Sequence, residues 1–143
     1  MIIPDINFLI YAYNSESKFH SQASHCLEEL FASNTTILLP WLVILGFLRI
    51  STSRKIFASP YTNQEAWEIV DSWFEKGNAS VIEPGTRFYG IMKGLCKDNN
   101  VVSDLLNDVY LASLAIENQC DLYSNDFDFA RFKGVKWINP FAQ

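Results

Sequence analysis

The sequence predicts an α/β fold in which about five short strands form a central parallel sheet flanked by helices. Three observations predict it. Short apolar runs recur along the chain, stretches with helical periodicity separate them, and no internal repeat or low-complexity tract interrupts this order. A regular alternation of strand and helix is typical of βα units packed around a parallel sheet.

Length and composition favour one domain spanning residues 1–143. The chain is 49% hydrophobic and 15% aromatic, which is enough material for one buried core. No apolar run approaches the roughly 20 residues that a membrane span requires, and the N-terminus lacks the basic and long apolar regions of a signal peptide. We therefore expect a soluble, cytoplasmic protein that does not bind membranes.

The expected strands are short apolar runs at residues 1–4, 37–40, 80–82, 122–124 and 135–138. Helical periodicity predicts helices at residues 20–33, 42–50, 66–75, 87–97 and 105–118. The first of these helices is amphipathic. Thr62 and Glu65 form a capping box ahead of the third helix, and Thr86 is expected to cap the fourth. The second and fifth are more uniformly apolar, so they should be inner helices packed on the sheet.

Two carboxylates follow predicted strands. Asp5 comes directly after residues 1–4, and Asp126 follows residues 122–124. Because the loops at the carboxyl ends of parallel strands converge on one edge of the sheet, both side chains are expected there. An Asp after a strand also commonly caps the next helix, so each position has a second interpretation.

A third carboxylate, Asp108, lies at helical spacing from Leu111 and Ala115, one turn before an apolar stripe. A charge in such surroundings requires a basic partner, a proton, a helix cap or a metal ion. The alternative is local: Asn107 or Asp108 starts the helix itself, or Asp104 does so one turn earlier.

Three acids at one sheet edge would repel one another without a cation, and their oxygen ligands select a hard ion such as Mg²⁺ or Mn²⁺. A site of this kind suits phosphodiester cleavage by a metal-activated water. Two other kinds of catalytic or metal site lack the residues that they require. His20 and His25 share one expected surface helix, and Cys26, Cys96 and Cys120 are widely separated, so neither a catalytic triad nor a thiolate zinc site is expected.

Five segments carry a family resemblance through their order and spacing. They read MIIPDIN from residue 1, GFLRI from residue 46, DVYLASLA from residue 108, LYSNDFDF from residue 122 and WINP from residue 137. They are similar to the D-x-N, E-F-L-R, D-A-x-L-A-A-L-A and L-x-T-x-D-x-D-F motifs and the usual ending of PIN-domain ribonucleases. The chain specifically resembles the VapC-type toxins of bacterial toxin–antitoxin systems.

The resemblance implies a three-layer α/β/α PIN-like domain with Asp5, Asp108 and Asp126 as its catalytic, metal-binding acids. Asn7 and Ser124 match positions that support these acids by hydrogen bonds in the family.

The remaining residues of the LYSNDFDF segment are expected to have structural roles. Asp128 should order the turn after the strand by accepting hydrogen bonds from nearby backbone N–H groups. Phe127 and Phe129 are interpreted as packing residues rather than as rings that stack on bases.

Gly46 departs from the family, which usually has Glu at this position. Asp104, one helical turn before Asp108, is a candidate replacement acid, although helix capping is its expected role. If the helix around Gly46 faces the site, Gly46→Glu should tighten Mn²⁺ binding and add some stability by removing a helical glycine.

Charge bears on how RNA would bind. The net charge of −5 argues against one broad basic surface that coats nucleic acid. Acid-free stretches at residues 30–64 and 84–97 nevertheless contain candidate phosphate contacts: Arg49, Arg54, Lys55, Lys93 and Lys97. Ordinary surface charge is the alternative interpretation. So small a contact set suits a structured RNA cut at an exposed loop.

The sequence therefore predicts a metal-dependent endoribonuclease that acts as the toxin of a toxin–antitoxin pair. Its expected partners are an RNA substrate, a small cognate antitoxin and a second copy of itself. The antitoxin should lay an amphipathic helix in a groove near the active site and insert a basic residue among the acids. The alternative is a catalytically degenerate PIN-fold protein that binds RNA or a protein without cleaving.

Overall fold

The computed structural model describes residues 1–141, and a parallel sheet forms its centre. The strands are β1 Ile2–Pro4, β2 Ile37–Pro40, β3 Ala79–Ile82, β4 Asp121–Tyr123 and β5 Lys136–Ile138. They lie in the order β3-β2-β1-β4-β5, and every neighbouring pair is parallel. The predicted α/β class with a sheet of five short strands is confirmed.

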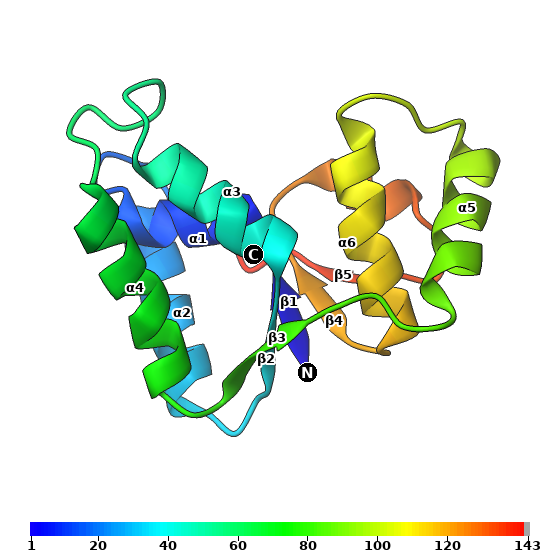
Figure 1. Ribbon diagram of the computed structural model, residues 1–143, viewed down its shortest axis with the longest axis horizontal. Coiled ribbons are helices and arrows are strands. Elements are labelled where there is room, and N and C mark those ends of the chain that lie inside the picture. Colours follow the sequence, from blue (N-terminus) through cyan, green and yellow to red (C-terminus); the bar gives the residue numbers. More distant parts are fainter. Residues whose placement is uncertain (142–143) are drawn as a thin grey trace.

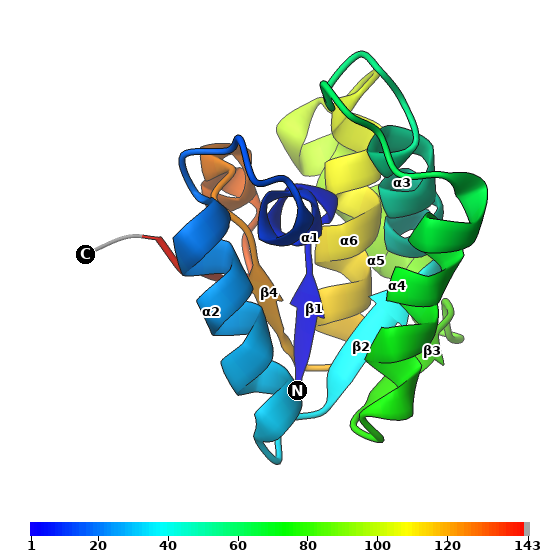
Figure 2. The same cartoon turned by 90° about the vertical axis from the view of Figure 1, so that its left-hand side faces the viewer.

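Helices cover the sheet on both sides (Figures 1 and 2). They are α1 Ile6–Tyr13, α2 His20–Ala32, α3 Trp41–Ser51, α4 Asn63–Glu75, α5 Phe88–Asn99 and α6 Leu105–Glu117. Helix α1 packs against α2 and α3, and α3 packs against α4. On the other side α6 contacts β1, β4 and α5. This is the expected three-layer arrangement. Of the described helices, none combines the length and apolar character that crossing a bilayer takes.

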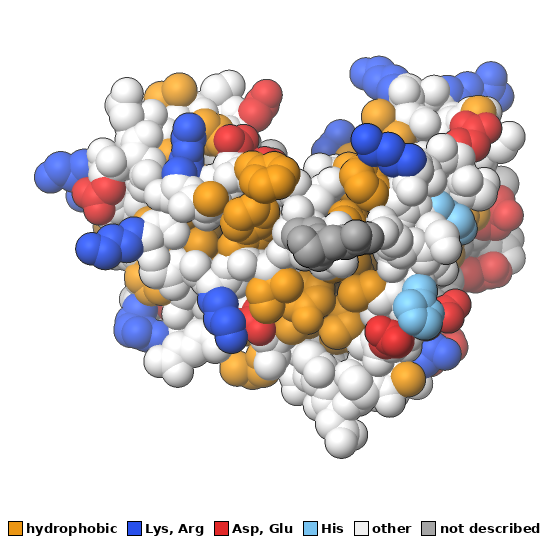
Figure 3. Space-filling model, turned by 180° about the vertical axis from the view of Figure 1, so that it is seen from behind, with side chains coloured by type: hydrophobic (Ala, Val, Ile, Leu, Met, Phe, Trp, Pro, Cys, Tyr) orange, Lys and Arg blue, Asp and Glu red, His pale blue; other side chains and the backbone are white. Residues whose placement is uncertain are grey.

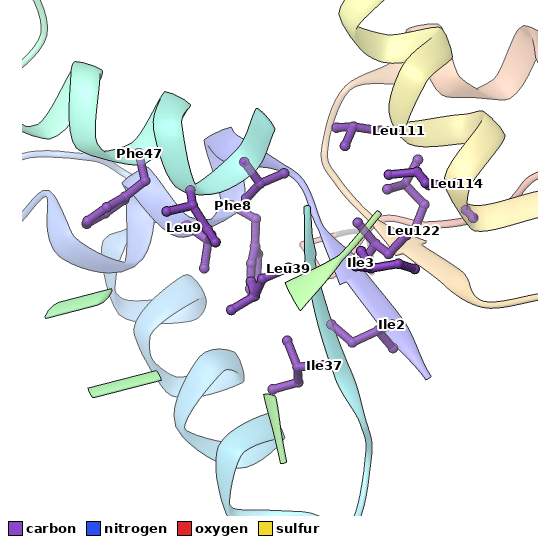
Figure 4. Packing of buried hydrophobic residues seen from close by; sticks show 14 of the residues in the cluster. Ile2, Ile3, Phe8, Leu9, Ile37, Leu39, Phe47, Leu111, Leu114 and Leu122 are labelled. Carbon is purple, nitrogen blue, oxygen red and sulfur yellow. The ribbon is translucent and has the colours of Figure 1, made fainter. Parts of the chain in front are cut away.

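The core lies where the central strands meet both helical layers. Ile3 and Leu122 are register partners in β1 and β4, and both are fully buried. Figure 4 shows Phe8, Leu9 and Phe47 on one side of the sheet and Leu111 and Leu114 on the other. Strands covered on both faces need continuous rather than alternating apolar residues, as these strands have.

Strand order places a switch point in the middle of the sheet. From β1 the chain builds outward through β2 to β3, and then it returns to the other side of β1 to form β4 and β5. The loops after β1 and β4 therefore leave in opposite directions and open a crevice at the carboxyl ends of these strands. Asp5 and Asp126 occupy those loops.

One helix was not among the predicted elements. Helix α1 is eight residues long, reads INFLIYAY and follows β1 directly. A short, almost uniformly apolar segment has the pattern of a buried strand as much as that of a helix. The Asp5 side chain marks the boundary, because it accepts a hydrogen bond from the Ile6 N–H at 2.7 Å.

The start of α5 also differs from the prediction. The helix begins at Phe88, with Arg87 at the N-cap position and no side-chain capping bond, so the expected cap by Thr86 is wrong. Instead the Glu117 carboxylate of α6 accepts hydrogen bonds from the Gly85 N–H at 2.8 Å and the Arg87 N–H at 3.0 Å. A carboxylate from a neighbouring helix thus satisfies N–H groups just before α5.

Candidate active site

A pocket of about 430 Å³ lies at the carboxyl ends of the central strands, between α1 and the first turn of α6. Five of the residues that line it are aspartates: Asp5, Asp104, Asp108, Asp126 and Asp128. The three acids expected at one edge of the sheet are therefore brought together. Figure 3 shows a hollow at the top of the molecule between two lobes, of which one contains α1 and α3 and the other contains α6 (Figure 1).

Asp5 is the most buried of these acids, with 6% of its surface exposed. One carboxylate oxygen accepts the Ile6 N–H at 2.7 Å, and the other accepts the Ser124 hydroxyl at 2.7 Å. Burial raises the pKa of Asp5 above its ordinary value, and these two hydrogen bonds oppose the rise. Asp5 thus caps α1 and lines the pocket, so both interpretations of this position hold together.

Ser124 makes the supporting contact that was expected of it. Besides donating to Asp5, its hydroxyl oxygen accepts the Asp126 N–H at 3.0 Å. Asn7 is different. It is exposed and lines the pocket, but its side chain makes no hydrogen bond to the acids within residues 1–141.

The turn after β4 is ordered by Asp126 rather than by Asp128. The Asp126 carboxylate accepts the Asp128 N–H at 2.9 Å and caps the short 3-10 helix η1, Phe127–Arg131. The role predicted for Asp128 in this turn is therefore wrong. Its carboxylate instead joins those of Asp108 and Asp126, and one oxygen from each lies within 4.8 Å of the others.

Asp108 lies in the first turn of α6 and is half-buried. Burial raises its pKa to about 7, and the nearby charges of Asp126, Asp5 and Asp128 add to the rise. In the described part of the chain, ion pairs form only between His25 and Glu29 and between Lys136 and Asp121. No basic side chain there neutralises the pocket acids.

A divalent cation fits this donor set. The pocket offers several carboxylates, these acids form no ion pair within residues 1–141, and burial together with the neighbouring acids raises the pKa of Asp108 to about 7. Hard ions such as Mg²⁺ and Mn²⁺ prefer all-oxygen ligands, and Mg²⁺ keeps several waters when few protein ligands are available. Asp108, Asp126 and Asp128 are the residues placed to hold such an ion, with Asp5 on the same wall.

Asp104 occupies the N-cap position of α6, but its side chain makes no capping hydrogen bond. The expected capping role is therefore wrong. Asp104 is exposed and lines the pocket, one turn before Asp108. It adds negative charge to the mouth of the site.

Apolar residues also line the pocket, and one of them contacts Gly46. Gly46 is buried in α3, and a Cβ atom there would lie 2.5 Å from Cδ1 and 3.0 Å from Cγ1 of Ile6. Ile6 and Ile50 both line the pocket. Ile6 thus fills the space next to Gly46, so a side chain added there must displace Ile6, which opposes the expected gain in stability.

The candidate phosphate contacts are all exposed but none lines the pocket. Arg49 precedes the pocket residue Ile50, Arg54 and Lys55 follow α3, and Lys93 and Lys97 lie on α5. Their role in binding RNA stays a prediction.

The two phenylalanines beside the acids have different surroundings. Phe129 is fully buried, as a packing residue should be. Phe127 is 73% exposed, so the packing interpretation fails for most of its ring. Composition and spacing could not distinguish these two positions, because the geometry of the turn decides which ring points inward.

The fold and the site together define a class of protein: an α/β domain with a candidate divalent-metal site at the switch point of a parallel sheet. The sequence model of the PIN domain matches residues 2–135. The chain belongs to the PIN-domain family.

Curated relatives match along the whole chain. Ribonuclease VapC33 of Mycobacterium tuberculosis is 36% identical over 143 residues, which cover 100% of both proteins. VapC ribonuclease Mb2897 of Mycobacterium bovis is 32% identical over 140 residues, which cover 98% of this chain and 95% of that protein.

Solved structures share the fold at lower identity. VapBC2 from Rickettsia felis, bound to a DNA fragment from its promoter, has a TM-score of 0.68 at 22% identity and covers 97% of this chain and 98% of that one. VapC20 of Mycobacterium tuberculosis, described as a sarcin-ricin loop cleaving toxin, has a TM-score of 0.64 at 15% identity. That match covers 95% of this chain and 99% of the other.

Proposed function

We propose that this protein is a metal-dependent endoribonuclease that acts as the toxin of a toxin–antitoxin pair. One observation carries the proposal: aspartates that form no ion pair within residues 1–141 converge at the switch point of the sheet. The chain that bears them is 36% identical over its full length to a protein named as a ribonuclease.

The side chains have separate tasks in this proposal. Asp108, Asp126 and Asp128 hold the ion, and Asp5 completes the charged wall. When bound, a divalent ion lowers the pKa of a water and offsets charge on the phosphate. Ser124 keeps Asp5 and the backbone of Asp126 in position through its two hydrogen bonds. Exposed basic residues outside the pocket, such as Arg49 next to the lining residue Ile50, contact phosphates on either side of the cut.

The degenerate, binding-only alternative rests on the missing acid at Gly46. The pocket nevertheless contains five aspartates, two more than the predicted three. Asp128 lies with the metal-binding group, and Asp104 lies at its mouth. A site that retains so many mutually repelling carboxylates favours the enzyme, because an apolar or neutral surface would bind RNA without that cost.

We further propose an antitoxin partner that uses a second pocket. This pocket of about 400 Å³ lies between α1, α2 and α4. Its lining is mostly apolar and includes two charged residues: Tyr13, Leu27, Glu28, Phe31, Trp73 and Lys76. It suits the apolar side chains of an amphipathic helix. The two pockets share no lining residue, so the antitoxin must extend beyond this pocket to reach the acids.

A homodimer is the third part of the proposal. Several large apolar side chains are exposed outside both pockets, and two of them, Trp41 and Leu45, are one helical turn apart on α3. Val81 is exposed on the edge strand β3. Apolar surface of this kind marks association sites.

The cytoplasmic location stays a prediction.

Controlled expression in a bacterial host tests the function. The wild-type protein should arrest growth, and RNA from the arrested cells should show new cleaved ends. Asp126→Asn should abolish both effects. Asp71→Asn, which changes an exposed acid of α4 away from the pocket, should keep both. Arrest that persists in Asp126→Asn without new RNA ends would favour the binding-only alternative.

A further inference from the structure

Phe127 is an exposed aromatic residue between two acids of the site. It stands between Asp126 and Asp128, whose carboxylates lie in the group that can hold an ion. Consecutive Cα atoms are about 3.8 Å apart, so the ring starts within one residue of both acids. Asp126 and Asp128 line the pocket, and Phe127, which stands between them in the sequence, does not.

The ring is held in place without being buried. It meets Trp137 with the ring centroids 5.3 Å apart and the planes at 74°, yet 73% of Phe127 stays exposed. The Trp137 indole N–H donates to the Ser124 carbonyl oxygen at 2.7 Å, and the Ser124 hydroxyl donates to Asp5. One hydrogen-bonded frame therefore fixes both the aromatic pair and the acids.

A structural role does not account for this ring. Phe129, two residues later, is fully buried and supplies the packing of this segment. Single exposed apolar residues are common on protein surfaces. The informative feature is the position of this one, which contacts Trp137 and stands between two carboxylates of the site.

We propose that Phe127 stacks on an unpaired base of the RNA substrate, beside the phosphate that enters the acidic pocket. The inference rests on the proposed ribonuclease function and names the form of its substrate. Unstacked bases of single-stranded RNA bind proteins by stacking on aromatic rings, and any base can do so. Bases inside a duplex are already stacked and paired.

Basic residues on the same segment of the chain agree with this occupant. Arg131 and Lys133 follow on the same segment, and both are exposed. Figure 3 shows hydrophobic side chains beside the hollow and Lys or Arg side chains on the lobes around it. Aromatic and basic groups side by side are the usual combination for single strands, because the rings take bases and the cations take phosphates.

RNA affinity tests the proposal. All variants carry Asp108→Asn so that the RNA is bound without being cut, and the probe is a fluorescent single-stranded RNA of mixed sequence. Phe127→Ala and Phe127→Leu should each weaken binding about 10-fold, the scale of losing one stacked base. Phe127→Trp should keep the affinity, because it keeps a π-face. A duplex of the same sequence should bind almost equally to all four proteins.

Trp67→Ala is the matched control, because Trp67 is an exposed aromatic residue on α4, which contributes nothing to the acidic pocket. It should leave the single-strand affinity unchanged. Thermal unfolding should also be unchanged in the Phe127 variants, since the ring is mostly exposed. Equal single-strand affinity in Phe127→Ala and the parent overturns the proposal. A ring that binds a protein partner instead of RNA would give this result. Full affinity in Phe127→Leu overturns it too, because apolar contact would then suffice without stacking.

The outcome is separable from that of the proposed function. If Phe127→Ala and Phe127→Leu lose single-strand affinity but the wild-type protein cleaves no RNA, the nuclease proposal fails and the stacking role stands. If the wild-type protein cleaves RNA and all Phe127 variants bind it equally, only the stacking role fails.

Discussion

At the residue scale, two of the pocket aspartates cap a helix and also line the pocket. Asp5 caps α1 and accepts the Ser124 hydroxyl, and Asp126 caps η1. A carboxylate has about four lone-pair positions, so these bonds leave others free toward the pocket. The capping bonds also fix the side chains before any ligand arrives. A helix cap and a metal ligand are therefore not alternatives at these positions.

The raised pKa of Asp108 predicts a pH dependence of stability. Its pKa is about 7 in the folded protein against 3.8 as the ordinary value, so the folded state binds this proton more tightly than the unfolded chain. The resulting stabilisation is full below pH 3.8 and is lost as the pH rises through about 7. Urea unfolding of the metal-free protein should show this decline.

Asp108→Asn should remove most of that decline, and saturating Mn²⁺ should raise the stability of the wild-type protein above pH 7. Asp5, whose pKa burial also raises, should leave a further dependence of the same sign. The same decline in wild type and Asp108→Asn would show that this carboxyl is not the source.

Gly46 and Ile6 form a coupled pair, which predicts the effect of substituting the glycine. Gly46→Ala places a methyl group 2.5 Å from Cδ1 of Ile6. Overpacking of this kind lowers the free energy of unfolding by about 1–3 kcal/mol. Alanine in place of glycine inside a helix raises it by about 1 kcal/mol. The variant should therefore be neutral to destabilised, and Gly46→Glu more destabilised.

An Ile6→Ala background supplies the control, because it removes the obstructing atoms. Gly46→Ala should then stabilise by up to about 1 kcal/mol. The two substitutions should be non-additive in urea unfolding. Additive effects would mean that the two side chains do not share this space.

At the element scale, the sequence predicted the helix start that depends on contacts between residues close together in the chain. The capping box before α4 is present as predicted, with Thr62 accepting the Glu65 N–H at 3.1 Å and Glu65 accepting the Thr62 N–H at 2.9 Å. Those residues are three apart, so the pattern is visible along the chain. The segment before α5 is held by Glu117, which is 30 residues or more from its partners. Nothing in the local sequence indicates that contact.

Removing the Glu117 carboxylate should weaken the start of α5. Glu117→Ala leaves the Gly85 and Arg87 N–H groups without their partner, and losing a cap costs about 0.5–2 kcal/mol. Glu117→Gln should cost less, since its amide oxygen can still accept one bond. Glu75→Ala, an exposed acid at the end of α4, serves as the control.

Hydrogen exchange would report the same contact directly, because the Gly85 and Arg87 amides should exchange faster in Glu117→Ala. Unchanged stability together with unchanged exchange would mean that water replaces the carboxylate without cost.

At the scale of the whole molecule, the topology assembles the site. Asp5 and Asp126 follow adjacent strands at the switch point, and α6 brings Asp108 to the same edge. These positions followed from strand order and motif spacing. The place of Asp128 in the acid group, the exposure of Phe127 and the contact between Ile6 and Gly46 did not. They depend on turn geometry and on packing between segments that are distant in sequence.

The exposed apolar surface of α3 predicts the oligomeric state. Leu45→Arg should convert a homodimer into a monomer in light scattering, because it places a charge in the expected apolar interface. Ile56→Arg is the matched control: Leu45 is 58% exposed and Ile56 is 56% exposed, but Ile56 lies in the loop after α3. A wild-type monomer, or a dimer that survives Leu45→Arg, would contradict this assignment.

The central claim is that the aspartate pocket holds a divalent ion on which RNA cleavage depends. The most direct measurement is cleavage of a structured RNA by purified protein before EDTA treatment, after it, and after Mn²⁺ is restored. Activity should disappear with EDTA and return with Mn²⁺, and Asp108→Asn should be about 100-fold slower or worse at every Mn²⁺ concentration while remaining folded. Full cleavage in EDTA, or normal cleavage by folded Asp108→Asn, would contradict the account.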